Sequence, residues 1–426
     1  MSSLSEHPLR YDVANELHAR PFPSVDAPGS AAYLALKPAQ NAAGRDRDAD
    51  RAHLIALLDR FGAQHPQPGA THYFGRIGRY RLKWESHTEF VTYTIFGEGV
   101  ADRPFDAVTF DTFPGDWLAE APGTRLTSAL IRIEELTDEA EILTKTSEWF
   151  VPESLAISRV LDDELIIAGD FHIDMGGHMR FAVFARPASG PRRLGRVVQR
   201  LCEIETYKAM AMLGLFRARA LGPGMKALDD RLSSLVTAMA GNVRGSEEML
   251  TGLLEIAAEL ERLVAETTFR FGATGAYETI VNQRIQILRE ERFSGLQTFG
   301  EFMMRRFDPA MRTVKSTEDR LKAMADRAIR AGELLRTRVD VERSAQNQKL
   351  LESMDRRSDL QLRLQRTVEG LSVVAISYYA VNLAIYILGP VGAEIGVDKL
   401  VMTAVVTPLV MLGVWWLVHR IRRSVE

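Results

Sequence analysis

Four side chains in one apolar segment have the types and spacing to contact ions or a neighbouring helix. Tyr379, Asn382 and Tyr386 are spaced i, i+3 and i+7, so they share one face of a helix. Ser372 lies further back along the same face. An asparagine in hydrocarbon needs a partner, which is either another helix or a watery path. The stripe therefore predicts either an interhelical hydrogen bond or the lining of a pore.

Gly389, Glu394 and Asp398 follow this segment and form a second candidate site, in a short polar loop. If several subunits surround an axis, the two carboxylates of each would form an acidic ring that concentrates cations at a pore mouth. The alternative is a solvated pair of loop carboxylates. Neither neighbouring apolar segment contains an acidic or basic residue, which argues against a buried proton relay.

His172, Asp174 and His178 surround a Met-Gly-Gly turn and are a weak candidate for metal binding. Strand alternation would place Asp170, His172 and Asp174 on one face of a strand. Imidazole and carboxylate groups can bind borderline or hard metals, but metal sites usually have a stronger spacing signature. The alternative is a solvated hairpin tip.

The sequence contains none of the motifs GxGxxG, GxxxxGK[ST], GxSxG and HExxH. Cys202, its one cysteine, lies on the apolar face of a predicted helix, whereas a nucleophilic thiolate needs an exposed, electropositive setting. We therefore expect no enzyme and no cofactor, with a divalent cation left as a transported or regulatory ion. A single cysteine also excludes an internal disulfide and favours a reducing compartment.

The chain has 426 residues, which is enough for two or three domains. Its 53 basic and 56 acidic residues nearly balance, so no charge footprint for nucleic acid is expected. Apolar residues instead concentrate in two charge-free runs, 371–388 and 400–418. Each is long enough to cross a bilayer as a helix, although a buried hairpin in a soluble core is the alternative.

The flanks of these runs predict their orientation. Arginines precede the first run and follow the second, while the connecting residues 389–399 carry one lysine. Positive charge stays on the cytoplasmic side, so we expect a multi-pass protein of the cell inner membrane with both termini cytoplasmic. Gly389-Pro390 is expected to end the first helix, and 419–426 would be a cytoplasmic tail.

The proline content divides the sequence before the apolar runs into a proline-rich first part and a proline-poor second part. Fourteen of the 17 prolines lie at or before Pro223, and proline is disfavoured inside helices. We predict an α/β domain over 1–223 with a mixed, largely antiparallel sheet, because its strand signals come in pairs joined by short turns. The expected strands are 79–84, 90–96, 155–160, 165–172 and 179–185. The expected helices are 50–61, with Asp50 as N-cap, and 140–150.

The remainder of the cytoplasmic part reads as helix. We predict a helical region over 224–345 and a stalk helix over 346–370 that continues into the first apolar run, from about Glu318 to Leu388. A sparse apolar stripe marks the stalk, formed by Leu350, Leu351, Met354, Leu360, Leu364, Val368 and Leu371.

Several long blocks resemble a bacterial family of membrane-anchored proteins of unknown function. They are ELHARPFP from Glu16, EWFVPESLAISRVLDDE from Glu148, GDFHIDMGGHMRFAVFARP from Gly169, GRVVQRLCEIETYKAMAMLGL from Gly195 and LQRTVEGLSVVAISYYAVNLAIYIL from Leu364. The whole chain is covered by this resemblance. It implies no established activity.

The order of the elements also resembles the CorA magnesium and cobalt channel superfamily. That resemblance implies a CorA-like architecture and a homo-oligomer, a pentamer, with the first span lining the pore. Members carry a Gly-Met-Asn motif at the outer end of that span, where this chain has Tyr386-Ile387-Leu388-Gly389-Pro390.

Two hypotheses follow. The first is a CorA-like homo-oligomeric cation channel or transporter without the Gly-Met-Asn motif. The second is a membrane-anchored interaction or regulatory module with no transport activity, whose hairpin only tethers it to the lipid bilayer.

Overall fold

The computed structural model describes residues 5–16, 22–241, 245–396 and 398–425. The chain divides into two compact units. The first comprises Met1–Gly241 with Thr251–Ala331, and the second comprises Asn242–Leu250 with Gly332–Glu426. Each unit is described by itself.

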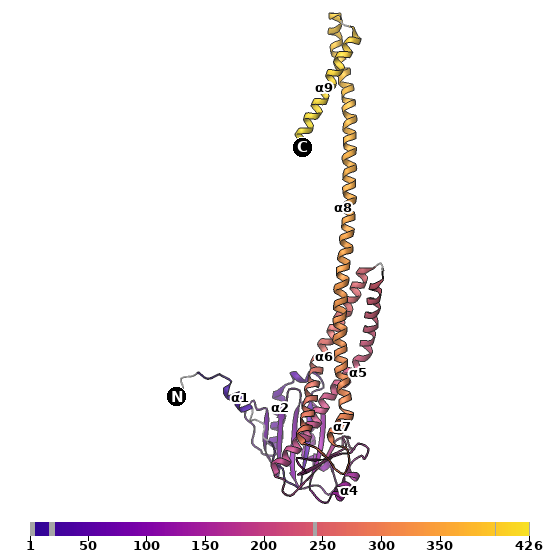
Figure 1. Ribbon diagram of the computed structural model, residues 1–426. Helices are drawn as coiled ribbons and strands as arrows, with labels where there is room; N and C mark the ends of the chain where they lie inside the picture. Colours follow the sequence, from indigo (N-terminus) through magenta and orange to yellow (C-terminus); the bar gives the residue numbers. More distant parts are fainter. Residues whose placement is uncertain (1–4, 17–21, 242–244, 397, 426) are drawn as a thin grey trace. The chain divides into compact units, whose positions relative to one another are not determined.

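A nine-stranded sheet forms the centre of the first unit (Figure 1). Its strand order is β2-β3-β4-β1-β5-β8-β7-β6-β9. The strands are β1 Gly29–Lys37, β2 His72–Ile77, β3 Tyr80–Ser86, β4 Val91–Glu98, β5 Thr124–Glu135, β6 Ala156–Val160, β7 Leu165–Gly169, β8 Met179–Ala185 and β9 Glu291–Arg292. Only the pairing of β5 with β8 is parallel among these strands. The predicted mixed, largely antiparallel sheet is confirmed.

The paired strand signals correspond to real hairpins, with one correction. β3 pairs with β4, and β6 with β7, as predicted. However, β7 ends at Gly169 rather than at His172. Phe171 adopts a positive φ of 55°, which takes the chain out of the extended region. The prediction that Asp170, His172 and Asp174 share a strand face is therefore wrong.

Short helices cover one face of the sheet. Strand alternation directs Leu34, Trp84 and Tyr93 toward α2, whose Leu54 and Leu57 are fully buried against them. The 3-10 helix η2 and α3 complete this layer, and α4 packs on β6–β8. These elements are η1 Ala42–Gly44, α2 Arg47–Arg60, η2 Ala107–Thr112, α3 Gly115–Ala119 and α4 Glu139–Trp149, with α1 Arg10–Glu16 near the N-terminus.

The start of α2 differs from the prediction. Asp46 is its N-cap, and its Oδ1 accepts hydrogen bonds from the backbone N–H of Asp48 at 2.8 Å and of Ala49 at 3.2 Å. Asp50 is instead buried one turn inside the helix, where its Oδ2 lies 2.7 Å from Arg45 Nε. The prediction of Asp50 as the N-cap is wrong, because the hydrophobic pattern of the segment does not show that Asp50 forms an ion pair with Arg45.

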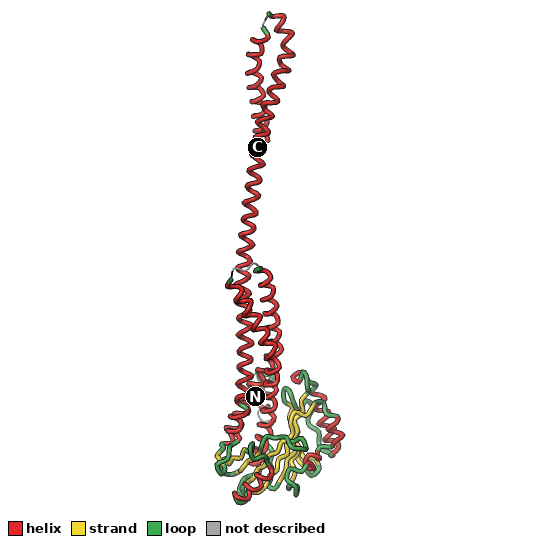
Figure 2. The backbone as a smooth tube through the Cα atoms, turned by 90° about the vertical axis from the view of Figure 1, so that its right-hand side faces the viewer, coloured by secondary structure: helices red, strands yellow, loops and turns green. Residues whose placement is uncertain are grey.

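Long helices follow the sheet, as predicted. They are α5 Pro191–Ala240, α6 Ser246–Leu288, the short α7 Phe299–Arg306 and α8 Asp308–Ile395 (Figure 2). Within the first unit, Asp229 of α5 pairs with Arg320 at 2.9 Å and with Arg327, both on α8. α5 runs through residues 221–224, at the predicted boundary between the α/β domain and the helical region. Burial of Leu221 and Met225 on either side of Pro223 stabilises this turn and outweighs the roughly 3 kcal/mol helix penalty of proline.

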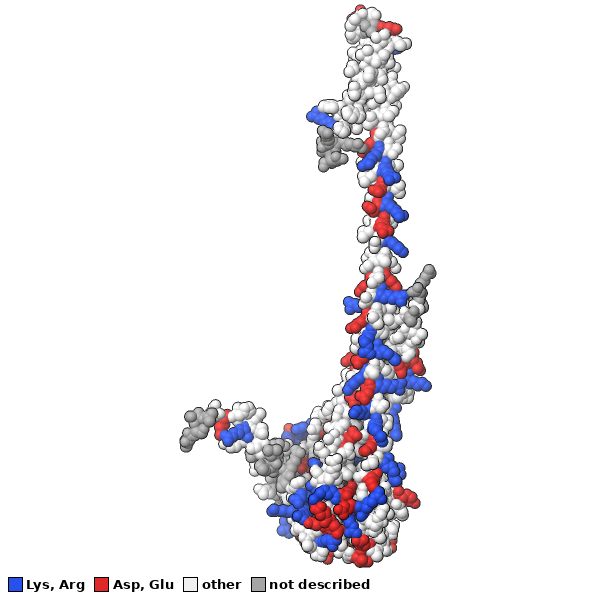
Figure 3. All heavy atoms as spheres, in the orientation of Figure 1, with Lys and Arg blue, Asp and Glu red and all other residues white. Residues whose placement is uncertain are grey.

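The second unit contains the end of α8 and α9 Lys399–Val425, two helices that are long and apolar enough to cross a membrane. The face shown in Figure 3 carries few charged side chains over the apolar segments of these two helices, whereas the stalk part of α8 is densely charged. α8 continues through Gly389 and Pro390 to Ile395, so the expectation that these residues end the helix is wrong. The predicted helix from Glu318 to Leu388 lies within α8.

Candidate functional site

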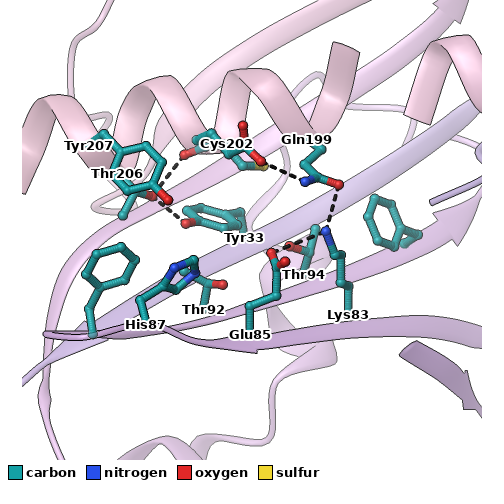
Figure 4. A pocket seen from close by; sticks show the side chains of 13 residues that line it. Tyr33, Lys83, Glu85, His87, Thr92, Thr94, Gln199, Cys202, Thr206 and Tyr207 are labelled. Atoms are coloured by element: carbon teal, nitrogen blue, oxygen red, sulfur yellow. Dashed lines mark hydrogen bonds and ion pairs between the residues drawn. The ribbon is translucent and has the colours of Figure 1, made fainter. Parts of the chain in front are cut away.

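A polar pocket lies between the sheet and α5, and it begins with the alternation of β3 and β4. Leu82 and Trp84 of β3 point into the apolar core beneath α2, so Lys83 and Glu85 point to the opposite face. The register places Lys83 opposite Thr94 and Glu85 opposite Thr92. A row of polar side chains on this part of the sheet therefore faces α5 (Figure 4).

α5 contributes a matching polar row to the same pocket. Gln199, Glu203 and Thr206 are spaced i, i+4 and i+7 and line it together with Cys202. On the flanking positions, apolar side chains such as Val198 and Leu201 are fully buried. The helix is thus held by its apolar residues, while its polar row meets the polar face of the sheet.

The charged groups of the pocket form a continuous chain of contacts. Lys83 Nζ donates to Gln199 Oε1 at 2.6 Å and lies 3.2 Å from Glu85 Oε2. Gln199 Nε2 donates to Glu203 Oε1 at 2.7 Å, and Glu203 also accepts from Arg284 of α6. Each carboxylate has a cationic partner, which is how ionised groups are tolerated at partly buried positions.

The pocket's hydroxyl and thiol groups are not activated for nucleophilic attack. The Tyr33 hydroxyl contacts Thr206, whose own hydroxyl donates to Cys202 O at 2.9 Å. Burial raises the pKa of the Cys202 thiol and of the Tyr33 phenol well above their ordinary values. A thiolate or phenolate is therefore disfavoured, and the arrangement suits binding better than covalent catalysis. The prediction that Cys202 is buried is confirmed. Its side chain, however, lines the polar pocket beside Gln199 and Glu203, so the predicted apolar surroundings are wrong.

The β3–β4 turn at the edge of the pocket is held from two sides. Arg45 donates to the carbonyl oxygens of His87 at 2.6 Å and Phe90 at 3.2 Å. Glu89, which is 1% exposed, accepts from Tyr277 of α6 at 2.9 Å and pairs with Arg270. These contacts fix the turn against α6.

The residues predicted as a metal site serve the loop after β7. His178 is buried, and its Nδ1 lies 2.9 Å from Ser128 Oγ; burial lowers its pKa. Asp174 accepts from the His178 backbone N–H at 2.9 Å, and His172 is exposed. Within the described residues there is no group of three or more His, Cys, Asp or Glu that could hold a metal ion.

The predicted stripe of Ser372, Tyr379, Asn382 and Tyr386 lies on α8. Tyr379 and Tyr386 are 72% and 79% exposed within the chain, whereas Ser377 on the other side of the helix is buried. Asn382 Nδ2 donates to Tyr378 O at 3.1 Å, and Ser372 Oγ donates to Val368 O at 2.8 Å. Both bonds are local to the helix, and the Asn382 carboxamide keeps further hydrogen-bonding capacity.

The second candidate group lies beyond the stripe. Gly389 and Glu394 are on the last turns of α8, and Glu394 is exposed. Asp398 immediately precedes α9 and is also exposed. The carboxylates are therefore at helix ends rather than in an eleven-residue loop.

Sequence reasoning missed the polar pocket. Its signal was present, because Lys83 and Glu85 alternate with Leu82 and Trp84 in a predicted strand. A polar face is usual for an antiparallel sheet with one side in water, so the alternation by itself does not indicate a pocket. The polar row of α5, matched to the polar face of the strands, was the indication that one covers the other.

Comparison with known proteins places the chain in one family. A family model described as "Protein of unknown function (DUF3422)" matches residues 5–425. No protein with a curated description matches the chain, and no solved structure does. The resemblance to the CorA superfamily thus stays a prediction.

Proposed function

The chain belongs to the DUF3422 family of proteins of unknown function, and from that premise we propose that it is a homo-oligomeric membrane protein that provides a path for cations. In this proposal α9 and the C-terminal part of α8 each cross the cell inner membrane, and both chain termini lie in the cytoplasm. The exposure of nearly all apolar side chains in these two segments supports insertion into a bilayer.

A heptad seam on α8 supports association with further copies of the chain. Its members are spaced by 4, 10, 4 and 3 residues, which keeps the same two heptad positions. All of them are more than half exposed within the chain. The seam consists of Leu350, Met354, Leu364, Val368 and Leu371. An isolated helix of this kind gains little stability in water, and most helical stability in proteins comes from packing of an apolar face. In this proposal, the seams of neighbouring copies pack against each other and bury the exposed apolar side chains.

The same seam leads to Asn382, and this is the observation that carries the proposal. Asn382 follows Leu371 by 11 residues, which is again a seam position. Tyr379 and Tyr386 flank it on the exposed side of α8. Around an axis shared by several copies, these side chains would provide a polar wall in an otherwise apolar segment. Glu394 and Asp398 would then attract cations toward one end of it.

Substitution of Asn382 tests the path. Asn382→Leu should reduce cation flux into proteoliposomes by tenfold or more, because an apolar constriction dewets. Asn382→Ser should retain most of the flux since it keeps a polar wall. Thr403→Val, which removes a hydroxyl from α9, is the matched control and should leave flux unchanged. Flux of magnesium, cobalt, zinc, nickel, sodium and potassium is measured for each variant.

The same preparations distinguish a path from a purely structural hydrogen bond. If Asn382 only bonds a neighbouring helix, Asn382→Leu should weaken assembly by about 0.6 to 2 kcal/mol, seen as easier dissociation in a detergent titration. Wild-type protein that conducts none of the six cations at any internal divalent concentration would refute the proposal.

The second candidate function is a membrane-anchored regulatory module without transport. It is favoured by the polar pocket under α5, which has the residues of a binding site but no activated nucleophile. Absence of flux in a stable oligomer would favour this candidate.

A further inference from the structure

A cavity of about 300 Å³ opens beside the polar pocket, between α5, α6 and the β3–β4 turn. It shares Gln199 and Glu203 with the polar pocket, and Arg200 and Arg284 line it on the helix side. Because one water occupies about 30 Å³ in the liquid, the space holds a small organic molecule rather than a single ordered water.

The carboxylates around the cavity have cationic partners, whereas one of its arginines has no hydrogen-bonding or ionic partner in the part of the chain that the structure describes. Glu203 is paired with Arg284 and Gln199, and Glu85 lies within ion-pair distance of Lys83. Among the described residues, the Arg200 guanidinium has no hydrogen bond or ion pair, although it is only partly exposed. The carboxylates are thus compensated and one cation is left over.

The environment of Arg200 is electropositive. Its pKa is lowered by burial and then by repulsion from Arg196. Attraction to Glu203 partly opposes this, while Arg284 and Arg289 add to the lowering. A cluster of arginines that repel one another is stabilised by an anion placed among them. The planar guanidinium group presents paired donors that match a phosphate or a carboxylate.

The remaining walls suit an organic body attached to such a group. Phe22 and Ile287 contribute apolar surface, and Tyr207 and His87 contribute aromatic rings. His87 stacks on Phe90 with ring centroids 4.4 Å apart, which holds its ring in place at the cavity. A ligand with a charged end and a less polar body would therefore contact both kinds of wall.

We propose that this cavity binds a small organic oxyanion, with its phosphate or carboxylate group on the guanidinium of Arg200 beside Arg284. The site belongs to the first unit and is independent of the proposed cation path. Binding there bridges α5 and α6 to the β3–β4 turn, so a bound anion should also stabilise this part of the fold.

The test measures binding of defined probes to the full-length protein in detergent by isothermal titration calorimetry. Adenosine monophosphate and citrate represent the phosphate and carboxylate forms, and inorganic phosphate represents the group alone. Arg200→Gln should weaken binding of the better organic probe by about 10- to 100-fold, the expected loss of one charge-assisted contact. Arg200→Lys keeps the positive charge but not the planar pair of N–H donors, so it should give an intermediate loss of affinity.

Arg219→Gln is the matched control, since it is the same change at an exposed site on α5, and it should leave the Kd unchanged. Thermal unfolding of each variant checks that the fold is retained. Two results would overturn the proposal. One is equal binding by Arg200→Gln and wild type, and the other is no binding of any probe by wild type at a probe concentration of about 10 mM.

Discussion

Leu364→Glu is expected to convert the proposed oligomer into smaller species, because it places a carboxylate on the apolar seam of α8. Leu364 is 66% exposed within the chain, so the substitution has little to disrupt inside one subunit. If the seam packs against other copies, each subunit loses the burial of a leucine side chain, about 1.5 to 3 kcal/mol, and like charges converge. Light scattering coupled to size-exclusion chromatography in mild detergent measures the change in mass.

Leu362→Glu is the control for this prediction. Leu362 is two residues away, is 54% exposed and lies off the seam. The same charge there should leave the mass of the complex unchanged. If Leu362→Glu dissociated the complex and Leu364→Glu did not, copies would associate through another face of α8, and the assignment of Asn382 to the axis would be wrong.

Asp170→Ala is expected to destabilise the first unit by about 3 to 5 kcal/mol, the usual cost of breaking a buried ion pair. Asp170 is fully buried, and its carboxylate accepts from Arg180 Nη2 at 2.7 Å and from the backbone N–H of Val151 at 3.0 Å. Alanine leaves these donors unpaired. The midpoint of thermal unfolding of the full chain, followed by tryptophan fluorescence, should fall by on the order of 10 °C.

Asp174→Ala distinguishes this structural role from metal binding. Its carboxylate accepts one backbone hydrogen bond, from His178, so its loss should cost about 1 kcal/mol. A chelator should leave the unfolding midpoint of the wild-type protein unchanged. A large chelator effect, abolished equally by both substitutions, would instead indicate a metal held by the loop after β7.

Local patterns were sufficient to predict much of the fold. The paired strand signals gave β3 with β4 and β6 with β7, because short turns between strands allow few other pairings. The proline-poor sequence after Pro223 correctly indicated long helices. Helices continue through Pro223, at the predicted domain boundary, and through Pro390, at the predicted helix end. The reason is the same at both positions, since the free-energy cost of proline inside a helix can be offset by packing or by a nearby helix end.

Contacts between distant segments could not be predicted. Asp50 was wrongly predicted as a cap. Its carboxylate pairs with Arg45, five residues earlier, and the position of Arg45 is set by its contacts with the distant β3–β4 turn. The polar pocket likewise depends on α5 covering one face of β3, a relation between residues more than a hundred positions apart. Periodicity describes each element separately, and the site is formed by their packing.

Disulfide cross-linking at Asn382 tests most directly whether the first apolar helix faces an axis shared by several copies. Asn382→Cys and Ile387→Cys are each made in a Cys202→Ala background, which removes the one native thiol. Ile387 is 65% exposed within the chain and lies on the opposite side of the helix from the seam. Under mild oxidation in native membranes, the account predicts covalent dimers for Asn382→Cys and none for Ile387→Cys. Cross-linking at Ile387 with none at Asn382 would contradict it.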